Sequence, residues 1–131
     1  AGNPHVVLSK QGSPFALFSF LAPSMDLSNG FDIHSMLVHM HHLGTKATVG
    51  VHRSDGTGET LLEVENYDFD WQLVYHLDNP VAFGSGDELS VSCTWDNSQS
   101  NQPSGEAAVD VNWGENTRDE MCVANLFITE R

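Results

Sequence analysis

Turn-forming residues interrupt this chain at short intervals, and this feature restricts the fold more than any other. Segments rich in Val, Phe, Leu and Trp are broken by Gly, Pro, Asn, Asp or Ser about every eight to twelve residues, which is typical of all-β proteins. A flat sheet of that many strands would leave one face unburied. We therefore predict an antiparallel β-sandwich of about eight to ten strands with jelly-roll topology, in a single domain spanning residues 1–131.

The expected strands are short, and no segment is predicted to be helical. Within the strand at 88–95, Leu89, Val91, Cys93 and Trp95 alternate and share one face. The full set of expected strands is 5–9, 15–20, 32–42, 46–53, 60–64, 69–77, 80–83, 88–95, 107–112 and 122–129.

The charge balance excludes some partners. Five Lys and Arg against eighteen Asp and Glu give a formal net charge of -13. This charge disfavours nucleic acid and anionic membrane surfaces and raises the local concentration of cations. No apolar run approaches the length of a membrane span. The composition suits an extracytoplasmic protein, secreted or periplasmic.

Cys93 and Cys122 are the only cysteines. An even pair is compatible with one disulfide, and it is equally compatible with two separate reduced thiols in a cytosolic core. The low Lys content and the many Asn and Ser residues favour an oxidising compartment.

Three histidines occupy four positions of an expected buried strand, His39, His41 and His42. Because side chains of a strand alternate, His39 and His41 point to one face, about 6 to 7 Å apart at their Cα atoms. Two imidazoles at this spacing can chelate one metal ion. The alternative is that such a pair, in a chain with seven histidines, only packs or lies on the surface.

Met121 stands in an acidic turn, where a thioether gains nothing from exposure to water. It can tuck into the edge of the core. Alternatively, it can complete a set of two imidazoles and one thioether, which selects copper, and Cu(I) in particular, over zinc or magnesium.

Three segments together resemble a known family: HMHHLG at 39–44, CTWDNS at 93–98 and WGENTRDEMC at 113–122. They are similar to the C-terminal domain of the copper type II, ascorbate-dependent monooxygenases. This family includes peptidylglycine alpha-hydroxylating monooxygenase and dopamine beta-monooxygenase, and the chain looks most like its bacterial members. Order and spacing match from about residue 32 to the C-terminus.

The resemblance assigns roles to individual residues. It implies that His39, His41 and Met121 bind one copper ion per chain, with no catalytic residue beyond these ligands, and that Cys93 and Cys122 form a disulfide. It implies that His42 is a neighbour of the site and not a ligand. Asp119 and Glu120 match an acidic pair that shapes the turn. The family's jelly-roll sandwich agrees with the fold expected from the strands.

The implied function is the oxygen-activating half of a monooxygenase that hydroxylates a C–H bond. Its partners would be dioxygen and an unknown small-molecule or peptide substrate, with ascorbate as reductant. Family enzymes hold a second copper in an N-terminal domain, and the remaining histidines here are scattered and expected to be structural or exposed. We therefore expect either part of a larger enzyme or a one-domain relative, for which the alternative function is an extracytoplasmic copper carrier or interaction module without turnover.

Overall fold

The structure is a computed structural model that describes the backbone of residues 1–131 and every side chain except that of Ser104. Its elements, in chain order, are β1 (Val6–Gly12), α1 (Phe15–Leu21), β2 (Phe31–His39), β3 (Gly44–His52), β4 (Gly58–Val64), β5 (Tyr75–Phe83), β6 (Glu88–Trp95), η1 (Gln99–Asn101), η2 (Pro103–Gly105) and β7 (Val123–Glu130).

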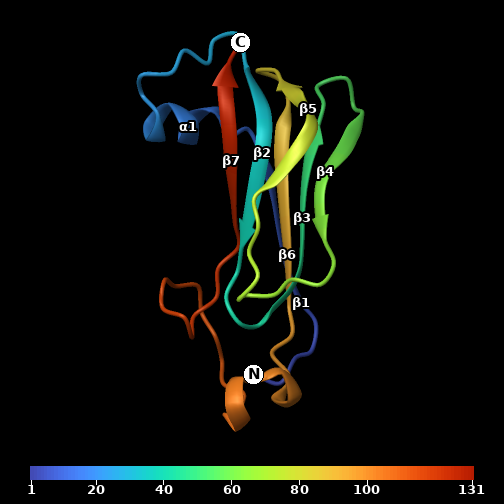
Figure 1. Cartoon of the computed structure of the whole chain (residues 1–131), viewed down its shortest axis with the longest axis vertical. Coiled ribbons are helices and arrows are strands. Elements are labelled where there is room, and N and C mark those ends of the chain that lie inside the picture. Colours follow the sequence, from blue (N-terminus) through green and yellow to red (C-terminus); the bar gives the residue numbers. More distant parts are fainter.

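The seven strands form two antiparallel sheets that pack face to face (Figure 1). One sheet has the order β1-β6-β3-β4 and the other has the order β5-β2-β7. The predicted antiparallel β-sandwich is confirmed, with fewer strands than the sequence suggested. The core lies between the sheets, where the rings of Phe31 and Phe83 stack with their centroids 4.7 Å apart.

The segment at 15–20 is helical, so its prediction as a strand was wrong. Phe15 and Phe18 are three positions apart, which places both on one side of a helix. Their rings lie 5.5 and 5.4 Å from that of Phe31, whereas Phe20 is 80% exposed. An apolar run of this length fits helix and strand equally well, and the aromatic contacts with the core select the helix.

The segment at 107–112, also expected as a strand, has no strand partner. Its main chain bonds to side chains of the preceding polar loop: Asn97 Nδ2 donates to the carbonyl of Val109, and Ala108 N donates to Gln99 Oε1. These contacts satisfy the backbone groups that a sheet would otherwise pair.

The strand expected at 69–77 begins later, at Tyr75, and continues through Pro80. Asp68 holds a turn before it, because its side chain accepts a hydrogen bond from Asp70 N and its carbonyl accepts one from Trp71 N. Pro80 is tolerated within β5 because this strand pairs only with β2 and has one free edge.

A disulfide joins Cys93 and Cys122, whose Cα atoms are 5.8 Å apart. Cys93 is fully buried on the inner face of β6, and Cys122 directly precedes β7. The bond therefore links the two sheets, and the implied pairing of the cysteines is confirmed.

Candidate metal centre

The main chain between the two candidate ligand histidines is held by a tyrosine. Strand β2 ends at His39, and the next residue, Met40, donates from its N–H to the hydroxyl of Tyr67 at 3.0 Å. The same hydroxyl donates to the carbonyl of Met40 at 2.7 Å. Burial raises the pKa of Tyr67, so the hydroxyl keeps its proton at neutral pH and both hydrogen bonds persist.

The rings of His39 and His41 lie together, as the strand alternation predicts. Their centroids are 5.1 Å apart and their planes meet at 77°. His41 is buried, with 5% of its surface exposed, and His39 is half-buried. The rings are therefore near neighbours at the end of β2, on the outer side of the sheet.

The hydrogen bond of His39 identifies which ring nitrogen carries its proton in the neutral form. His39 Nδ1 lies 2.7 Å from Gln72 Oε1. The amide of Gln72 is oriented because its Nε2 donates to the carbonyl of Phe69 at 2.8 Å. The Gln72 oxygen can only accept, so Nδ1 carries the proton and Nε2 has a free lone pair.

The neighbouring His41 is oriented by main chain. Its Nδ1 lies 2.8 Å from the carbonyl oxygen of Asp119, which can only accept. His41 therefore has the same tautomer as His39, with its Nε2 lone pair free. This pattern, in which Nδ1 donates to a fixed acceptor, is the one found in metal-binding histidines.

The carboxylate of Glu120 binds three N–H groups around the histidine loop. One oxygen accepts from His41 N at 2.9 Å and from the Trp95 indole at 2.8 Å. The other accepts from Leu43 N at 2.8 Å. Glu120 thus fixes the segment that carries His41. This role is more specific than the shaping of the turn that the sequence led us to expect.

The turn before Glu120 is itself closely packed. The carboxylate of Asp119 accepts from Asn116 N at 3.2 Å and from Asn116 Nδ2 at 2.8 Å. A Cβ added at Gly114 would lie 2.2 Å from Asp119 Oδ2. Only glycine fits at position 114 without moving the turn that presents the Asp119 carbonyl to His41.

The backbone places Met121 between two points of contact with the histidine strand. The carbonyl of Asp119 bonds His41, and Val123 pairs with His39. Consecutive Cα atoms are about 3.8 Å apart, so the Met121 Cα lies within about 7.6 Å of both contact residues.

The side chain of Met121 lines a cavity of about 240 Å³ whose walls also include Trp95, Trp113 and Cys122. Neither His39 nor His41 lines this cavity. The structure thus brings the two imidazoles together, whereas the side chain of Met121 lines a cavity that neither histidine reaches.

Phe69 lies among all three histidine rings. Its centroid is 4.2 Å from that of His42 and 6.4 and 6.0 Å from those of His39 and His41. His42 is exposed and packs on Phe69, as expected for a neighbour of the site. Sequence reasoning missed Phe69, Tyr67 and Gln72, because each reaches the site from a distant loop and no local motif marks it.

Within the described side chains, no three His, Cys, Asp or Glu residues gather in a way that could hold a metal ion. His34 bonds Thr129, and His52 bonds Ser90.

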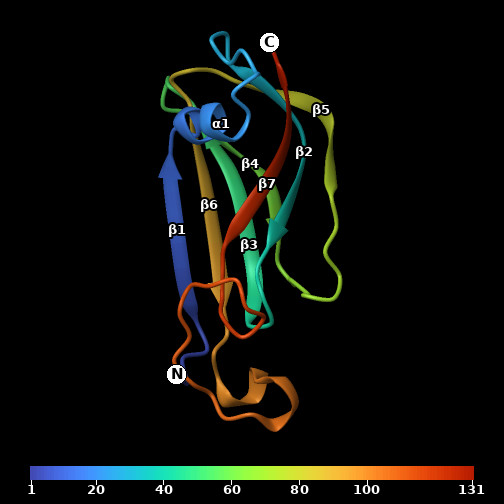
Figure 2. The ribbon, with the colours of Figure 1, turned by 90° about the vertical axis from the view of Figure 1, so that its left-hand side faces the viewer.

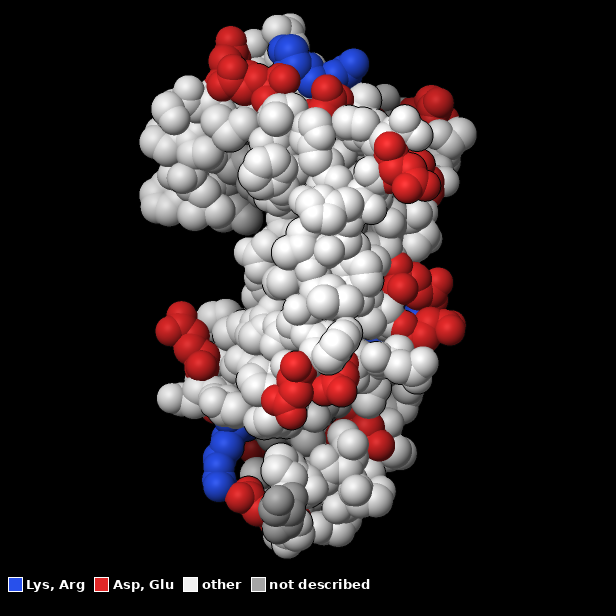
Figure 3. All heavy atoms as spheres, in the orientation of Figure 1, with Lys and Arg blue, Asp and Glu red and all other residues white. Residues whose placement is uncertain are grey.

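Charge is distributed unevenly around the site. In Figure 3 the acidic side chains gather toward both ends of the molecule and along one edge, while the middle of the face over β2 and β7 carries none. Leu37, Asn125 and Phe127 come from the outward-facing positions of these strands. The middle of this sheet face is thus uncharged, while the exposed Asp68 and Asp70 flank Phe69 beside the histidine rings.

The family model for the C-terminal domain of copper type II ascorbate-dependent monooxygenases matches residues 21–129. The chain belongs to this family. The match covers β2 to β7 and begins earlier than the segments that carry the resemblance in the sequence. Copper dependence and the use of ascorbate as reductant are properties of this monooxygenase family. No helix in the described chain is long and apolar enough to cross a membrane.

Proposed function

We propose that His39, His41 and Met121 hold one copper ion, and that this monooxygenase domain is the oxygen-activating half of an enzyme that hydroxylates a substrate C–H bond. The observation that carries the proposal is the occupation of both Nδ1 atoms by fixed acceptors, which leaves both Nε2 atoms free. Dioxygen and an unidentified substrate would be its partners, and ascorbate its reductant.

The donor set fits copper. Two neutral imidazoles with one thioether favour copper, and Cu(I) in particular, over zinc or magnesium. A ligating imidazole nitrogen lies about 2.0–2.1 Å from its metal, so two rings sharing a tetrahedral ion have centroids about 5 Å apart. The separation of the His39 and His41 centroids is 5.1 Å. This agreement supports a shared ion at the two rings.

The surrounding residues support the pair in distinct ways. Gln72 and the Asp119 carbonyl hold the two rings in the tautomer that can ligate. Phe69 limits access of water from one side. Glu120 accepts hydrogen bonds directly from the His41 and Leu43 main chain, and its negative charge favours a cation nearby.

When bound, copper supplies the redox chemistry through which members of this family use dioxygen. Family membership favours the monooxygenase half over a copper carrier, which would need the ligands but no approach for a substrate. The uncharged face over β2 and β7 offers such an approach (Figure 3). We also propose an extracytoplasmic location, which the Cys93–Cys122 disulfide supports.

The ligand set is tested by Cu(I) competition with a chromophoric chelator. We expect the unmodified chain to bind one Cu(I), and Met121→Leu to weaken binding at least tenfold, about 1.4 kcal/mol, with the melting temperature retained. Met25→Leu is the matched control, because Met25 is also partly buried and packs against the core elsewhere. Equal Cu(I) affinity for Met121→Leu and Met25→Leu would remove Met121 from the site.

A further inference from the structure

Strand β1 is left without a covering strand. The sheet that contains it has four strands and the opposing sheet has three, and Figure 2 shows β1 at the outer edge, beyond β7. The consequence is seen in its side chains: Val6 is 39% exposed and Leu8 is 42% exposed. Two apolar side chains of a sandwich strand thus face a space that no strand fills.

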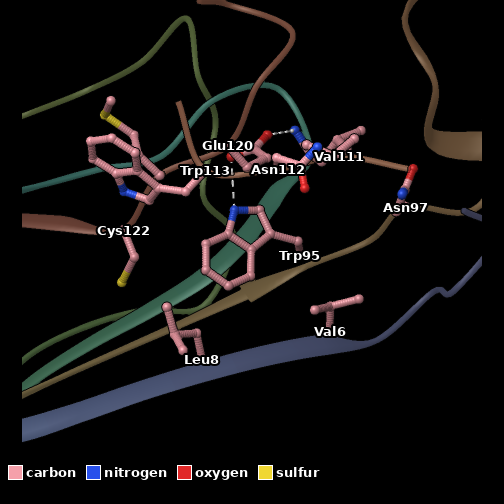
Figure 4. A pocket seen from close by; sticks show the side chains of 11 residues that line it. Val6, Leu8, Trp95, Asn97, Val111, Asn112, Trp113, Glu120 and Cys122 are labelled. Carbon is pink, nitrogen blue, oxygen red and sulfur yellow. Dashed lines mark hydrogen bonds between the residues drawn. The ribbon is translucent and has the colours of Figure 1, made fainter. Parts of the chain in front are cut away.

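At one end of β1 this space is the cavity of about 240 Å³ beside Met121. Figure 4 shows Val6 and Leu8 on one side and Trp113 on the other, with the Trp95 ring between them. The walls are mainly apolar and include Leu43, Val111 and Cys122. The candidate thioether ligand is therefore part of an apolar wall.

Two polar side chains at the wall, Glu120 and Asn97, are already engaged in hydrogen bonds within the protein. Both carboxylate oxygens of Glu120 accept hydrogen bonds from the protein, and one of the donors is the Trp95 indole. The Asn97 amide donates to Val109 O and accepts from Gln102 Nε2. The Glu120 carboxylate is the charged group among the lining residues and disfavours an anionic ligand, and the mainly apolar walls favour an uncharged one.

The volume limits the size of such a ligand. An engineered apolar cavity of about 150 Å³ holds benzene, whereas pockets for drug-sized ligands are about 300 Å³ or more. We propose that this cavity binds a small uncharged apolar group, of the size of one substituted aromatic ring, against Met121. Its assignment as the apolar part of the substrate rests on the proposed function.

The test uses the copper-free chain, so that its result does not depend on copper binding. Toluene is titrated while the indole N–H resonances of Trp95 and Trp113 are followed by NMR. We expect saturable shifts of both resonances, and none with benzoate, which has the same ring and a negative charge. Absence of saturation with toluene, or equal binding of benzoate, would overturn the proposal.

Two substitutions on β1 locate the site. Leu8→Trp puts bulk into the cavity and should weaken toluene binding at least tenfold. Val7→Trp puts the same bulk on the opposite face of β1, since Val7 does not line the cavity, and should leave binding unchanged. Leu8→Ala serves where Leu8→Trp fails to fold; it removes one apolar wall of the cavity and should also weaken toluene binding. Equal toluene affinity of Leu8→Trp and Val7→Trp, or of Leu8→Ala and the unmodified chain, would place the ligand elsewhere.

The contact with Met121 has its own measurement. With ¹³C-methyl methionine, toluene should shift the Met121 methyl resonance, assigned by its loss in Met121→Leu, and leave that of Met25 in place. If toluene binds and only the Met121 methyl fails to move, the link to the substrate is wrong. If the methyl resonance moves but Cu(I) does not bind His39 and His41, the proposed function is wrong, whereas the proposal that the cavity binds an apolar group stands.

Discussion

Two carboxylates, Glu120 and Asp87, perform the same task at opposite ends of β3. Glu120 gathers N–H groups next to the start of β3, close to the histidines. Asp87 gathers them beyond its end, accepting from Gly84 N at 3.0 Å and Ser54 N at 3.1 Å. Each carboxylate therefore stabilises a loop at one end of β3, because it accepts hydrogen bonds from main-chain N–H groups that have no partner in a strand.

The two carboxylates differ in how their charge is balanced. Arg53 bonds Asp87 at 2.9 Å and also pairs with Glu59, whereas no described Lys or Arg forms an ion pair with Glu120. Burial alone would raise the pKa of Asp87, but hydrogen bonds from Gly84, Arg53 and Ser54 outweigh it and hold this pKa below its ordinary value. The comparison indicates that Asp87 belongs to a network with its own counter-charge, while no described Lys or Arg side chain balances the charge of Glu120.

The largest effect is expected from Glu120→Ala. It leaves the N–H groups of His41, Leu43 and Trp95 without acceptors, at about 1 kcal/mol or more each. We expect about 3 kcal/mol loss of unfolding free energy in urea, together with weaker Cu(I) binding by the folded fraction. Unchanged Cu(I) affinity would show that Glu120 is as purely structural as Asp87.

The matching substitution at the other end is Asp87→Asn. Loss of the charged partner of Arg53 should lower the unfolding free energy by about 1–2 kcal/mol, since hydrogen bonds to charged groups are worth about that much. Cu(I) affinity should not change, because Asp87 is at the far end of β3. A fall in affinity comparable to that of Glu120→Ala would erase the distinction between the two networks.

A smaller effect on copper is expected from Gln72→Leu. It removes the acceptor that orients His39, and loss of such a partner typically weakens metal binding by about tenfold or more. The imidazole nitrogen shifts of His39 in NMR should show a mixture of tautomers. Retained Nδ1 protonation with full Cu(I) affinity would show that another group orients the ring.

The smallest effect is a pH dependence. A carboxyl whose pKa is lower in the folded state stabilises the fold above its unfolded pKa of about 3.9, and this contribution is lost as pH falls through the folded value. The stability difference between the unmodified chain and Asp87→Asn should therefore be constant near neutral pH and shrink below about pH 4. Urea unfolding at several pH values measures it, and a difference that widens on acidification would contradict the direction of the shift.

The sequence allowed the sandwich and the histidine pair to be predicted for the same reason. Turn residues divide the chain into strands, and strand alternation places His39 and His41 on one face. Residues 15–20 were predicted as a strand because their apolar run carries no period that separates helix from strand, and docking of Phe15 and Phe18 on Phe31 decides between them.

The residues that orient the two histidines could not be predicted from the sequence, for a related reason. Tyr67 and Gln72 act on residues 27 and 33 positions earlier, and nothing in their own neighbourhood marks them. The acceptor for His41 is a backbone carbonyl, which every residue possesses and no sequence pattern can single out.

The bond between Cys93 and Cys122 has a practical consequence for handling the protein. Met121 precedes Cys122 directly, so this bond anchors the candidate sulfur ligand to β6. Dithiothreitol or a similar thiol, added to keep copper monovalent, would cut the anchor and compete for the metal. Ascorbate reduces copper without attacking the disulfide. Samples prepared with ascorbate would therefore keep Met121 anchored while copper binding is measured.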